Sequence, residues 1–326
     1  MIQQLNWGII GCGNVTEVKS GPAFNKVPNS SLVAVMRRDG NKAREYAQRH
    51  GVPKWYDDAY ALINDPAVNA IYIATPPSSH EEYTLASLAT GKPVYVEKPM
   101  AMNATSCLKM AAASKQHHTK LTVAHYRRQL PMFRKIHAFL QANVIGDIRF
   151  VNLRLLQSPS KNMIAQTEVN WRVDPAISGG GLFHDLAPHQ LDILYYFFGN
   201  AKAVNGYATN QAGMYAADDL VTGSIMFDSN IVVNGLWCFS VPESEVTDVC
   251  EIVGSRGKIS FSFFGDRIII NTGGNEEHLH LPYPQHVQQP MIEEVVKYFL
   301  GTAPNPCTAE EATTIMQWID TMTKPM

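Results

Sequence analysis

The sequence predicts an α/β protein of two domains: an N-terminal doubly wound parallel sheet, then a C-terminal α/β domain with a large, mostly antiparallel open sheet. The chain has 326 residues, which is more than a single domain usually holds. Short apolar runs alternate with amphipathic stretches over roughly the first 120 residues, the pattern of successive βαβ units. From Ile148 onward, longer β-rich runs follow one another across tight turn signals, which indicates antiparallel neighbours.

The first half is expected to contain short strands separated by helices. Asp39 suits the N-cap of the first helix, and Gly91 suits the end of the second. We place the domain boundary near residues 122–126, which gives domains 1–123 and 124–326. The expected strands are 5–10, 32–36, 70–74, 94–96 and 121–124, and the expected helices are 41–50, 79–90 and 103–117.

The second half is expected to be rich in strands, with two amphipathic helices whose apolar residues repeat at i, i+3, i+4 and i+7. Leu191 and Phe198 belong to the first of these helices, and Ile292 and Phe299 to the second. The last helices are candidates for packing back onto the first domain. The expected strands are 148–157, 203–209, 220–227, 231–239, 246–253, 258–263 and 267–271.

Composition argues against several classes of protein. Hydrophobic residues make up 45% of the chain, charged residues 17%, and the net charge is -2, so an electrostatic nucleic-acid binder is not indicated. The five cysteines are odd in number and far apart, which argues against a zinc cluster or a disulfide framework. The N-terminus enters a strand pattern at once, and the longest apolar stretches are too short for a membrane span. We therefore expect a cytoplasmic protein.

A glycine turn follows the first predicted strand. Gly11 and Gly13 stand where a strand turns into a helix, and glycines there let the backbone approach a pyrophosphate. Asn14 and Val15 continue the turn, and Thr16 occupies the third position of the G-x-G-x-x-G pattern. Two glycines in an ordinary tight turn are the alternative. Because the turn opens a series of βαβ units, it predicts a dinucleotide-binding Rossmann domain over residues 1–123.

The end of the second strand bears on the choice between NADP and NAD. Arg37 and Arg38 stand where an acidic side chain would grip the adenosine ribose, and two cations there favour a 2′-phosphate. The alternative is that both arginines are solvated and Asp39 binds the ribose. We expect NADP, with NAD as the second choice.

Polar side chains follow two further strands at the same edge of the predicted sheet. Lys98 stands at the carboxyl end of the strand 94–96, where it would meet a substrate hydroxyl or carbonyl. Thr75, Pro76 and His80 follow the strand 70–74 and are expected to line the nicotinamide side. The alternatives are a surface lysine beside a turn proline and a helix cap.

A glycine-rich turn leads into a helix that carries Asp185, His189 and Asp192 at i, i+4 and i+7, and these side chains share one helix face. Histidine exchanges protons near neutral pH, and a carboxylate one turn away can orient it or contact another hydroxyl. The alternative is a buried structural histidine with a capping aspartate. No metal is expected, since His184 and Asp185 are adjacent and project in different directions.

Taken together, these motifs resemble the glucose-fructose oxidoreductase, inositol dehydrogenase and MocA family over most of the chain. The Glu-Lys-Pro turn and the later Gly-Gly-Gly-x-x-x-Asp-x-x-x-His run are far more specific than the glycine turn. Thr16 stands where small residues are usual in the family, and the Arg37-Arg38 pair differs from the acidic ribose grip of NAD-specific members. The motifs that carry the resemblance are residues 8–14, 74–80, 97–99, 171–172, 179–181, Asp185 and His189.

The resemblance implies a Rossmann domain, then an α/β domain whose open sheet forms oligomer contacts, as in a homodimer or homotetramer. It implies that Lys98 positions the substrate and that His189 is the general acid/base, with Asp185 as its polar partner. Glu97 and Lys98 would also contact the cofactor, Trp171 and Arg172 would lie near cofactor or substrate, and Tyr126 and Arg127 would contact substrate.

The expected reaction is hydride transfer between C4 of a nicotinamide and a carbinol or carbonyl carbon of a sugar, cyclitol or related polyol. Two alternatives stay open. One is a redox-neutral, NAD-dependent glycoside hydrolase of the same fold, and the other is a regulator that binds nucleotide or sugar without turnover.

Overall fold

The computed structural model describes residues 3–159 and 171–324. The chain divides into two compact units, the first made of Met1–Tyr126 and Pro284–Met316 and the second of Arg127–Tyr283 and Gln317–Met326. The division into domains 1–123 and 124–326 remains a prediction, since compact packing does not show which segment folds alone. None of the helices in the described part of the chain is both long and apolar enough to cross a membrane.

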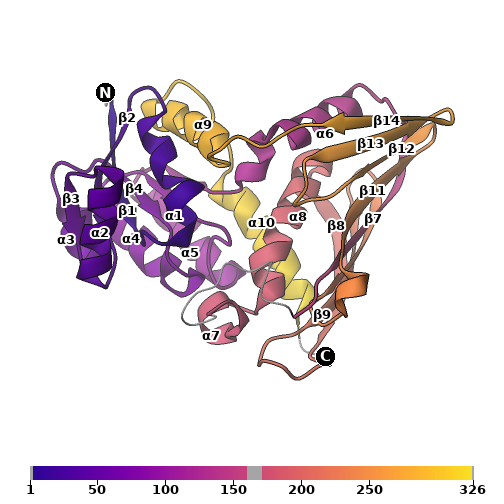
Figure 1. The fold of residues 1–326 in the computed structure, drawn as a ribbon, viewed down its shortest axis with the longest axis horizontal. Coiled ribbons are helices and arrows are strands. Elements are labelled where there is room, and N and C mark those ends of the chain that lie inside the picture. Colours follow the sequence, from indigo (N-terminus) through magenta and orange to yellow (C-terminus); the bar gives the residue numbers. More distant parts are fainter. Residues whose placement is uncertain (1–2, 160–170, 325–326) are drawn as a thin grey trace. The chain divides into compact units, whose positions relative to one another are not determined.

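The first unit is built on a parallel sheet (Figure 1). In its described residues six strands lie in the order β3-β2-β1-β4-β5-β6, so the order reverses between β1 and β4. This is the doubly wound sheet that the sequence predicts, and in such sheets ligands bind at the carboxyl ends of the strands near the reversal. The strands are β1 (Leu5–Ile10), β2 (Ser30–Met36), β3 (Lys54–Tyr56), β4 (Ala70–Ile73), β5 (Val94–Val96) and β6 (Leu121–Val123).

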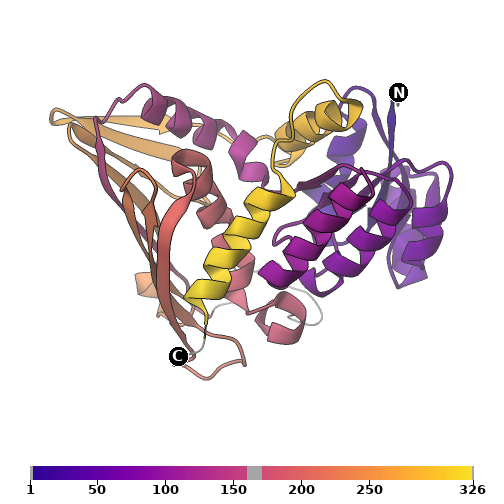
Figure 2. The ribbon, with the colours of Figure 1, turned by 180° about the vertical axis from the view of Figure 1, so that it is seen from behind.

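Helices cover the faces of this sheet, and α4 and α5 lie side by side on one of them (Figure 2). Asp39 caps α2, as predicted, and Asn103 caps α5 through the N–H of Ser106. The ring of Phe299 stacks on Trp7 with centroids 5.6 Å apart, so α9 packs against β1. The helices are α1 (Asn14–Val18), α2 (Gly40–His50), α3 (Ala59–Asn64), α4 (His80–Ala89), α5 (Ala104–Gln116) and α9 (Gln289–Leu300), with 3-10 turns η1 (Gly21–Asn25) and η2 (Pro77–Ser79).

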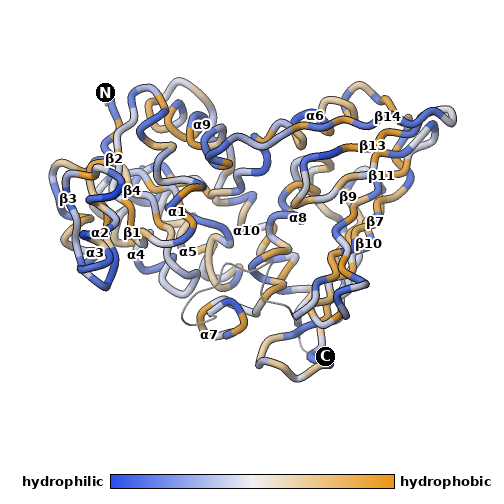
Figure 3. The backbone as a smooth tube through the Cα atoms, in the orientation of Figure 1, coloured by the Kyte–Doolittle hydropathy of each residue, from blue (hydrophilic) through white to orange (hydrophobic). Residues whose placement is uncertain are grey.

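The second unit is built on a mostly antiparallel sheet, again as predicted. In its described part eight strands lie in the order β14-β13-β12-β11-β7-β10-β9-β8, and among them only β7 and β10 pair in parallel. The edge strand β14 is hydrophilic and exposed (Figure 3). The strands are β7 (Ile148–Leu156), β8 (Ala201–Thr209), β9 (Leu220–Phe227), β10 (Val232–Cys238), β11 (Thr247–Gly254), β12 (Gly257–Phe261), β13 (Arg267–Thr272) and β14 (Asn275–His280).

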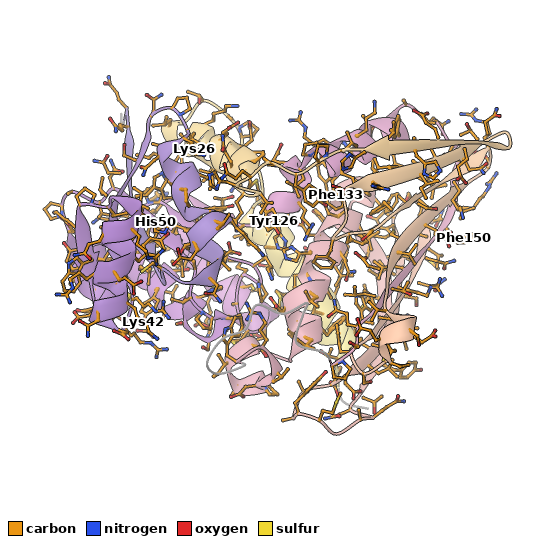
Figure 4. The ribbon with its side chains drawn as sticks, in the orientation of Figure 1. Lys26, Lys42, His50, Tyr126, Phe133 and Phe150 are labelled. Carbon is orange, nitrogen blue, oxygen red and sulfur yellow. The ribbon has the colours of Figure 1, made fainter. Side chains whose placement is uncertain are left out.

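The two faces of this second sheet differ. Along β7, Val151 and Leu153 are buried while Asn152 and Arg154 are exposed, which is the alternation expected of a half-covered sheet. Helix α8 lies along the buried face (Figure 1), and Phe150, which is 38% exposed, lies on the side away from α8 (Figure 4). The helices of the second unit are α6 (Pro131–Gln141), α7 (Pro175–Ser178) and α8 (Leu182–Phe198), and α10 (Ala309–Met322) begins in the first unit and enters the second at Gln317. The 3-10 turns are η3 (Tyr126–Gln129), η4 (Trp171–Val173) and η5 (Glu243–Glu245).

Candidate active site

Gly11 is required by the fold of the first unit itself. Its φ is +95°, and a Cβ added there would lie 2.8 Å from backbone atoms of both Ala74 and Thr75. The N–H groups of Gly11 and Cys12 both donate to the carbonyl of Met36, at 2.9 and 3.0 Å.

Burial raises the pKa of the Cys12 thiol to about 11, so the turn carries a protonated thiol at neutral pH.

The packing of the first unit does not require glycine at position 13, in contrast to position 11. A Cβ added there would meet nothing nearer than the carbonyl oxygen of Gly11, at 3.9 Å, among the described residues. Asn14 and Val15 begin α1 directly after it. Close by in the fold, the buried hydroxyl of Thr75 has no hydrogen-bond partner within the described residues. An open turn beside an unsatisfied hydroxyl fits a dinucleotide whose pyrophosphate approaches the backbone closely.

Three charged residues follow β2: Arg37 and Arg38 are cations, and Asp39 caps helix α2. Arg37 is half-buried and Arg38 is exposed. Oδ1 of Asp39 accepts hydrogen bonds from the N–H groups of Asn41 at 3.0 Å and Lys42 at 3.2 Å. Asp39 therefore serves the first turn of α2, and β2 ends at Met36, directly before the two arginines.

Glu97 and Lys98 follow β5, and their environments differ. Lys98 is half-buried. Glu97 is 6% exposed, and its Oε1 accepts from the Tyr72 hydroxyl at 2.5 Å and from Nε2 of Gln288 at 2.6 Å. Its Oε2 accepts from the backbone N–H of Lys98 at 3.2 Å. The carboxylate of Glu97 is thus part of a polar network inside the first unit.

His80 ties together the two loops that follow β4 and β5. Its ring is buried, with Nε2 2.8 Å from the carbonyl oxygen of Thr75 and Nδ1 3.0 Å from that of Pro99. Desolvation lowers the pKa of His80, against the opposing effect of these carbonyls. Pro76 precedes η2 and accepts from the Ser79 hydroxyl at 3.2 Å. The cofactor contact expected of His80 stays a prediction, and its observed contacts hold the loops on either side of it.

In the second unit, helix α8 carries Asp185, His189 and Asp192, as the spacing predicts. Asp185 is paired, because Nε of Arg172 donates to its Oδ2 at 3.0 Å. The guanidinium of Arg172 also lies 4.5 Å from the centroid of the Trp171 ring. Trp171, Arg172 and Asp185 therefore form one cluster between η4 and α8.

Asp192 forms a different and more buried pair. Its Oδ1 accepts from Arg128 at 2.7 Å (Nη2) and 3.0 Å (Nε), and both side chains are less than a twentieth exposed. The guanidinium of Arg128 lies 5.9 Å from the ring centroids of Tyr195 and Tyr196. This pair ties η3 to α8 inside the second unit, so Asp192 has a structural partner despite sharing a helix face with His189.

His189 is buried and meets an aromatic side chain that the sequence did not single out. Its ring is nearly perpendicular to that of Phe264, with centroids 6.0 Å apart. The guanidinium of Arg127 lies 4.6 Å from the same Phe264 ring, and its Nη1 donates to the carbonyl of Phe263 at 2.6 Å. Asp248 fixes this turn by accepting from the N–H of Phe264 at 2.8 Å. No local motif marks Phe264, since its role depends on where the β12–β13 turn folds.

His184 is enclosed by the glycine-rich turn before α8. A Cβ at Gly180 would lie 2.1 Å from its ring, so the absence of a side chain at Gly180 makes room for the imidazole. Burial lowers the pKa of His184 to about 4. Within the described residues, no group of three or more histidine, cysteine, aspartate or glutamate side chains is arranged to hold a metal ion.

The predicted site residues thus form two sets, each within one unit. The first unit holds the buried Tyr126 together with the glycine turn, Arg37, Arg38, the 75–80 loop, Glu97 and Lys98. The second unit holds Arg127, Trp171, Arg172, Asp185 and His189.

The chain matches two family models in succession. Residues 5–125 match the model described as "Oxidoreductase family, NAD-binding Rossmann fold", and residues 133–260 match the GFO/IDH/MocA C-terminal domain.

Similar proteins agree with these matches. Oxidoreductase P35 of Formosa agariphila is 47% identical over 98% of both chains. The trans-1,2-dihydrobenzene-1,2-diol dehydrogenase of Bos taurus is 29% identical, over 78% of this chain and 72% of its own length. A levoglucosan dehydrogenase solved with NADH and levoglucosan has a TM-score of 0.86 at 21% identity, with 98% of this chain and 96% of that one covered. The resemblance seen in the sequence is confirmed: the chain belongs to the GFO/IDH/MocA family of oxidoreductases, whose N-terminal domain is an NAD-binding Rossmann fold.

Proposed function

We propose that this protein transfers a hydride between C4 of the nicotinamide of NAD(P) and a carbinol or carbonyl carbon of a sugar, cyclitol or related polyol. The observation that carries the proposal is Lys98, a half-buried lysine at the carboxyl end of β5 in the same unit as the open Gly13 turn. The names of the bovine diol dehydrogenase and the levoglucosan dehydrogenase support a CH–OH substrate.

In this proposal Lys98 and His189 act on one reacting carbinol. The bound nicotinamide supplies or accepts the hydride. The ammonium of Lys98 binds the reacting oxygen and stabilises its developing alkoxide character. His189 removes the hydroxyl proton in oxidation and returns it in reduction. Asp185, held by Arg172, orients His189 or binds a neighbouring hydroxyl.

The proposed contacts to the dinucleotide come mostly from the first unit, with NADP preferred because Asp39 serves as a helix cap while Arg37 and Arg38 precede it. The proposed substrate contacts are Lys98, Tyr126, Arg127, Asp185 and His189. The proposed cofactor contacts are Gly11, Gly13, Asn14, Val15, Arg37, Arg38, Thr75, Pro76, His80, Glu97, Lys98, Trp171 and Arg172.

We also propose a cytoplasmic homodimer or homotetramer that assembles through the uncovered face of the eight-stranded sheet. This face combines exposed apolar side chains, Phe150, Tyr207 and Met226, with a shallow groove. The groove is lined by polar and apolar residues of four adjacent strands, among them Asn152, Arg154, Asn234, Leu236 and Glu251. A sheet face that exposes several large apolar side chains is typical of an interface between subunits.

The proposal is tested by following reduced nicotinamide at about 340 nm with a panel of sugars, cyclitols and diols, using NAD and NADP separately. We expect turnover with at least one polyol and a higher kcat/KM with NADP. Release of sugar from a glycoside with no net change in reduced nicotinamide would instead favour the redox-neutral hydrolase. Tight cofactor binding without turnover on any compound would favour a regulator.

Two variants separate the parts of the proposal. Lys98→Met should reduce kcat by about a thousandfold and change cofactor affinity far less, since the lysine acts mainly on the developing alkoxide and is one of many proposed contacts to the cofactor. The double variant Arg37→Ser, Arg38→Ser should reduce kcat/KM for NADP by at least about tenfold and leave that for NAD within about threefold. Full turnover in Lys98→Met would refute the role of Lys98.

A further inference from the structure

A buried carboxylate lies next to the main chain from which Lys98 branches. One oxygen of Glu97 accepts the backbone N–H of Lys98, and the other accepts two side-chain donors, the Tyr72 hydroxyl and the Gln288 amide. A buried carboxylate is costly unless its oxygens are hydrogen-bonded. The two donors therefore determine where Glu97 lies, and Glu97 in turn fixes the backbone at Lys98.

Gln288 reaches this network from far along the chain. It stands just before α9, 191 positions after Glu97, and only 1% of it is exposed. Its own backbone N–H donates to the carbonyl of Lys19 at 3.1 Å, and Nδ1 of His286 lies 2.6 Å from the carbonyl oxygen of Val18. The segment 286–288 thus joins the end of α1, which follows the glycine turn, to the carboxylate beside Lys98.

Two tyrosine hydroxyls belong to the network: that of Tyr72 donates to Glu97, and that of Tyr95 donates to Oε1 of Gln288 at 3.5 Å. Tyr72 and Tyr95 stack with ring centroids 5.1 Å apart, and both rings are fully buried. Burial raises the pKa of each hydroxyl well above 10, so both stay protonated at any working pH. The amide of Gln288 likewise donates without carrying a charge. The position of Glu97 is therefore maintained by neutral donors across the whole neutral range.

We propose that Gln288 is a positioning residue for the reaction, which rests on the function proposed above. By holding the carboxylate of Glu97, it fixes the backbone at Lys98 so that the lysine ammonium meets the reacting oxygen. Gln288 acts through Glu97 and is not itself one of the proposed contacts to the dinucleotide. Its loss should therefore slow the chemical step much more than it weakens cofactor binding.

The main test is Gln288→Met, which keeps the length of the side chain and removes its amide donor. We expect kcat to fall by about tenfold or more, since small displacements of a catalytic group have large effects on rate. The primary deuterium isotope effect on kcat should rise, while the Kd for reduced cofactor stays within about twofold. The matched control is Gln289→Met, because Nε2 of that neighbouring glutamine bonds Glu293 within α9 at 3.2 Å. The control should behave as the unaltered enzyme.

Two further measurements keep the inference falsifiable. Tyr72→Phe removes the other donor to the same oxygen and should reproduce the same split between kcat and Kd, even if Gln288→Met folds poorly. Reductive methylation of Lys98, followed by peptide mass spectrometry, reports on the lysine without any turnover. If Gln288→Met or Tyr72→Phe loosens the backbone at Lys98, methylation of Lys98 should become about threefold faster relative to that of the other lysines.

These measurements also separate this inference from the proposed function. If no polyol is turned over but Lys98 methylation responds to Gln288→Met, the oxidoreductase proposal for polyols fails and the positioning role stands. Unchanged kcat and unchanged Lys98 methylation in both variants would overturn the positioning role. The positioning role would also be overturned if the fall in kcat were fully explained by a loss of cofactor affinity, or by a smaller fraction of folded protein as judged from thermal unfolding.

Discussion

The guanidinium of Arg172 and the carboxylate of Asp185 form an ion pair in which Nε donates to Oδ2 at 3.0 Å. The arginine side chain is 11% exposed and the aspartate 16%. A pair that is this far withdrawn from water holds a defined geometry, and the Trp171 ring centroid lies 4.5 Å from the same guanidinium. The carboxylate expected to assist His189 is therefore oriented by a residue outside α8.

The first prediction concerns this pair. Asp185→Asn and Arg172→Gln should each lower kcat/KM, and the double variant should cost about 1–3 kcal/mol less than the sum of the single effects. The reason is that either change already removes the interaction that orients Asp185. Steady-state kinetics of the four proteins measures the coupling. Additive effects would show that the two side chains act independently.

The second prediction contrasts the two glycines of the turn. Gly11→Ala should destabilise the cofactor-free protein by more than about 1 kcal/mol, since its φ is positive and backbone atoms lie 2.8 Å from the new Cβ. Gly13→Ala should leave the free energy of unfolding within about 1 kcal/mol of the parent but weaken NADP binding by at least tenfold. Urea unfolding and cofactor titration measure the two quantities. Parent-like NADP affinity in Gly13→Ala would contradict the proposed pyrophosphate site.

The third prediction concerns the buried pair of Arg128 and Asp192. Asp192→Asn keeps the shape of the side chain but removes the charge that compensates Arg128, so we expect a loss of about 3 kcal/mol in the free energy of unfolding. The control is Lys297→Met, because its ion pair with Glu294 is exposed and should contribute less than about 1 kcal/mol. Chemical denaturation of both variants gives the comparison. Equal small losses would show that the Arg128 pair adds little to stability.

The fourth prediction follows from His184, whose pKa burial lowers from 6.5 to about 4. Between these two pH values the unfolded chain binds a proton that the folded chain does not bind. The free energy of unfolding should therefore fall as pH drops through this window, by up to roughly 3 kcal/mol at pH 4. His184→Gln should flatten this slope in denaturation curves recorded at several pH values. His278→Gln, at an exposed position, should retain the parent slope, and a slope unchanged in His184→Gln would refute the assignment.

Much of the fold could be predicted because its signals are local. The bounds of β1, β5 and β9 agree with the predicted strands, since β1 and β5 are mainly apolar runs and β9 has apolar residues at both ends and a turn signal directly after it. β3 is only three residues long and β14 is polar, so neither has a periodicity to detect. β14 forms through its backbone bonds to β13. Helix α10 was not predicted, although it begins with a capping box: Thr308 directly precedes the helix, and Glu311 lies in its first turn.

The candidate site was predictable to a smaller degree. Gly11 and Lys98 stand at strand ends, where a local pattern is enough to suggest a function. Arg172 was named through the family resemblance, but its pairing with Asp185, like the contact of Phe264 with His189, depends on how separate elements pack in the second unit. Gln288 meets Glu97 only because the chain returns to the first unit after residue 283. Such partners depend on tertiary structure and leave no spacing pattern in the sequence.

The helix cap formed by Asp39 limits how coenzyme specificity can be re-engineered. Because one oxygen of this carboxylate serves two N–H groups of α2, exchanging Asp39 to alter ribose recognition would also fray the start of that helix. A designer who wishes to reverse the proposed preference for NADP should introduce the acidic group at position 37 or 38 and leave position 39 intact. Changes in binding could then be interpreted without a confounding loss of local order.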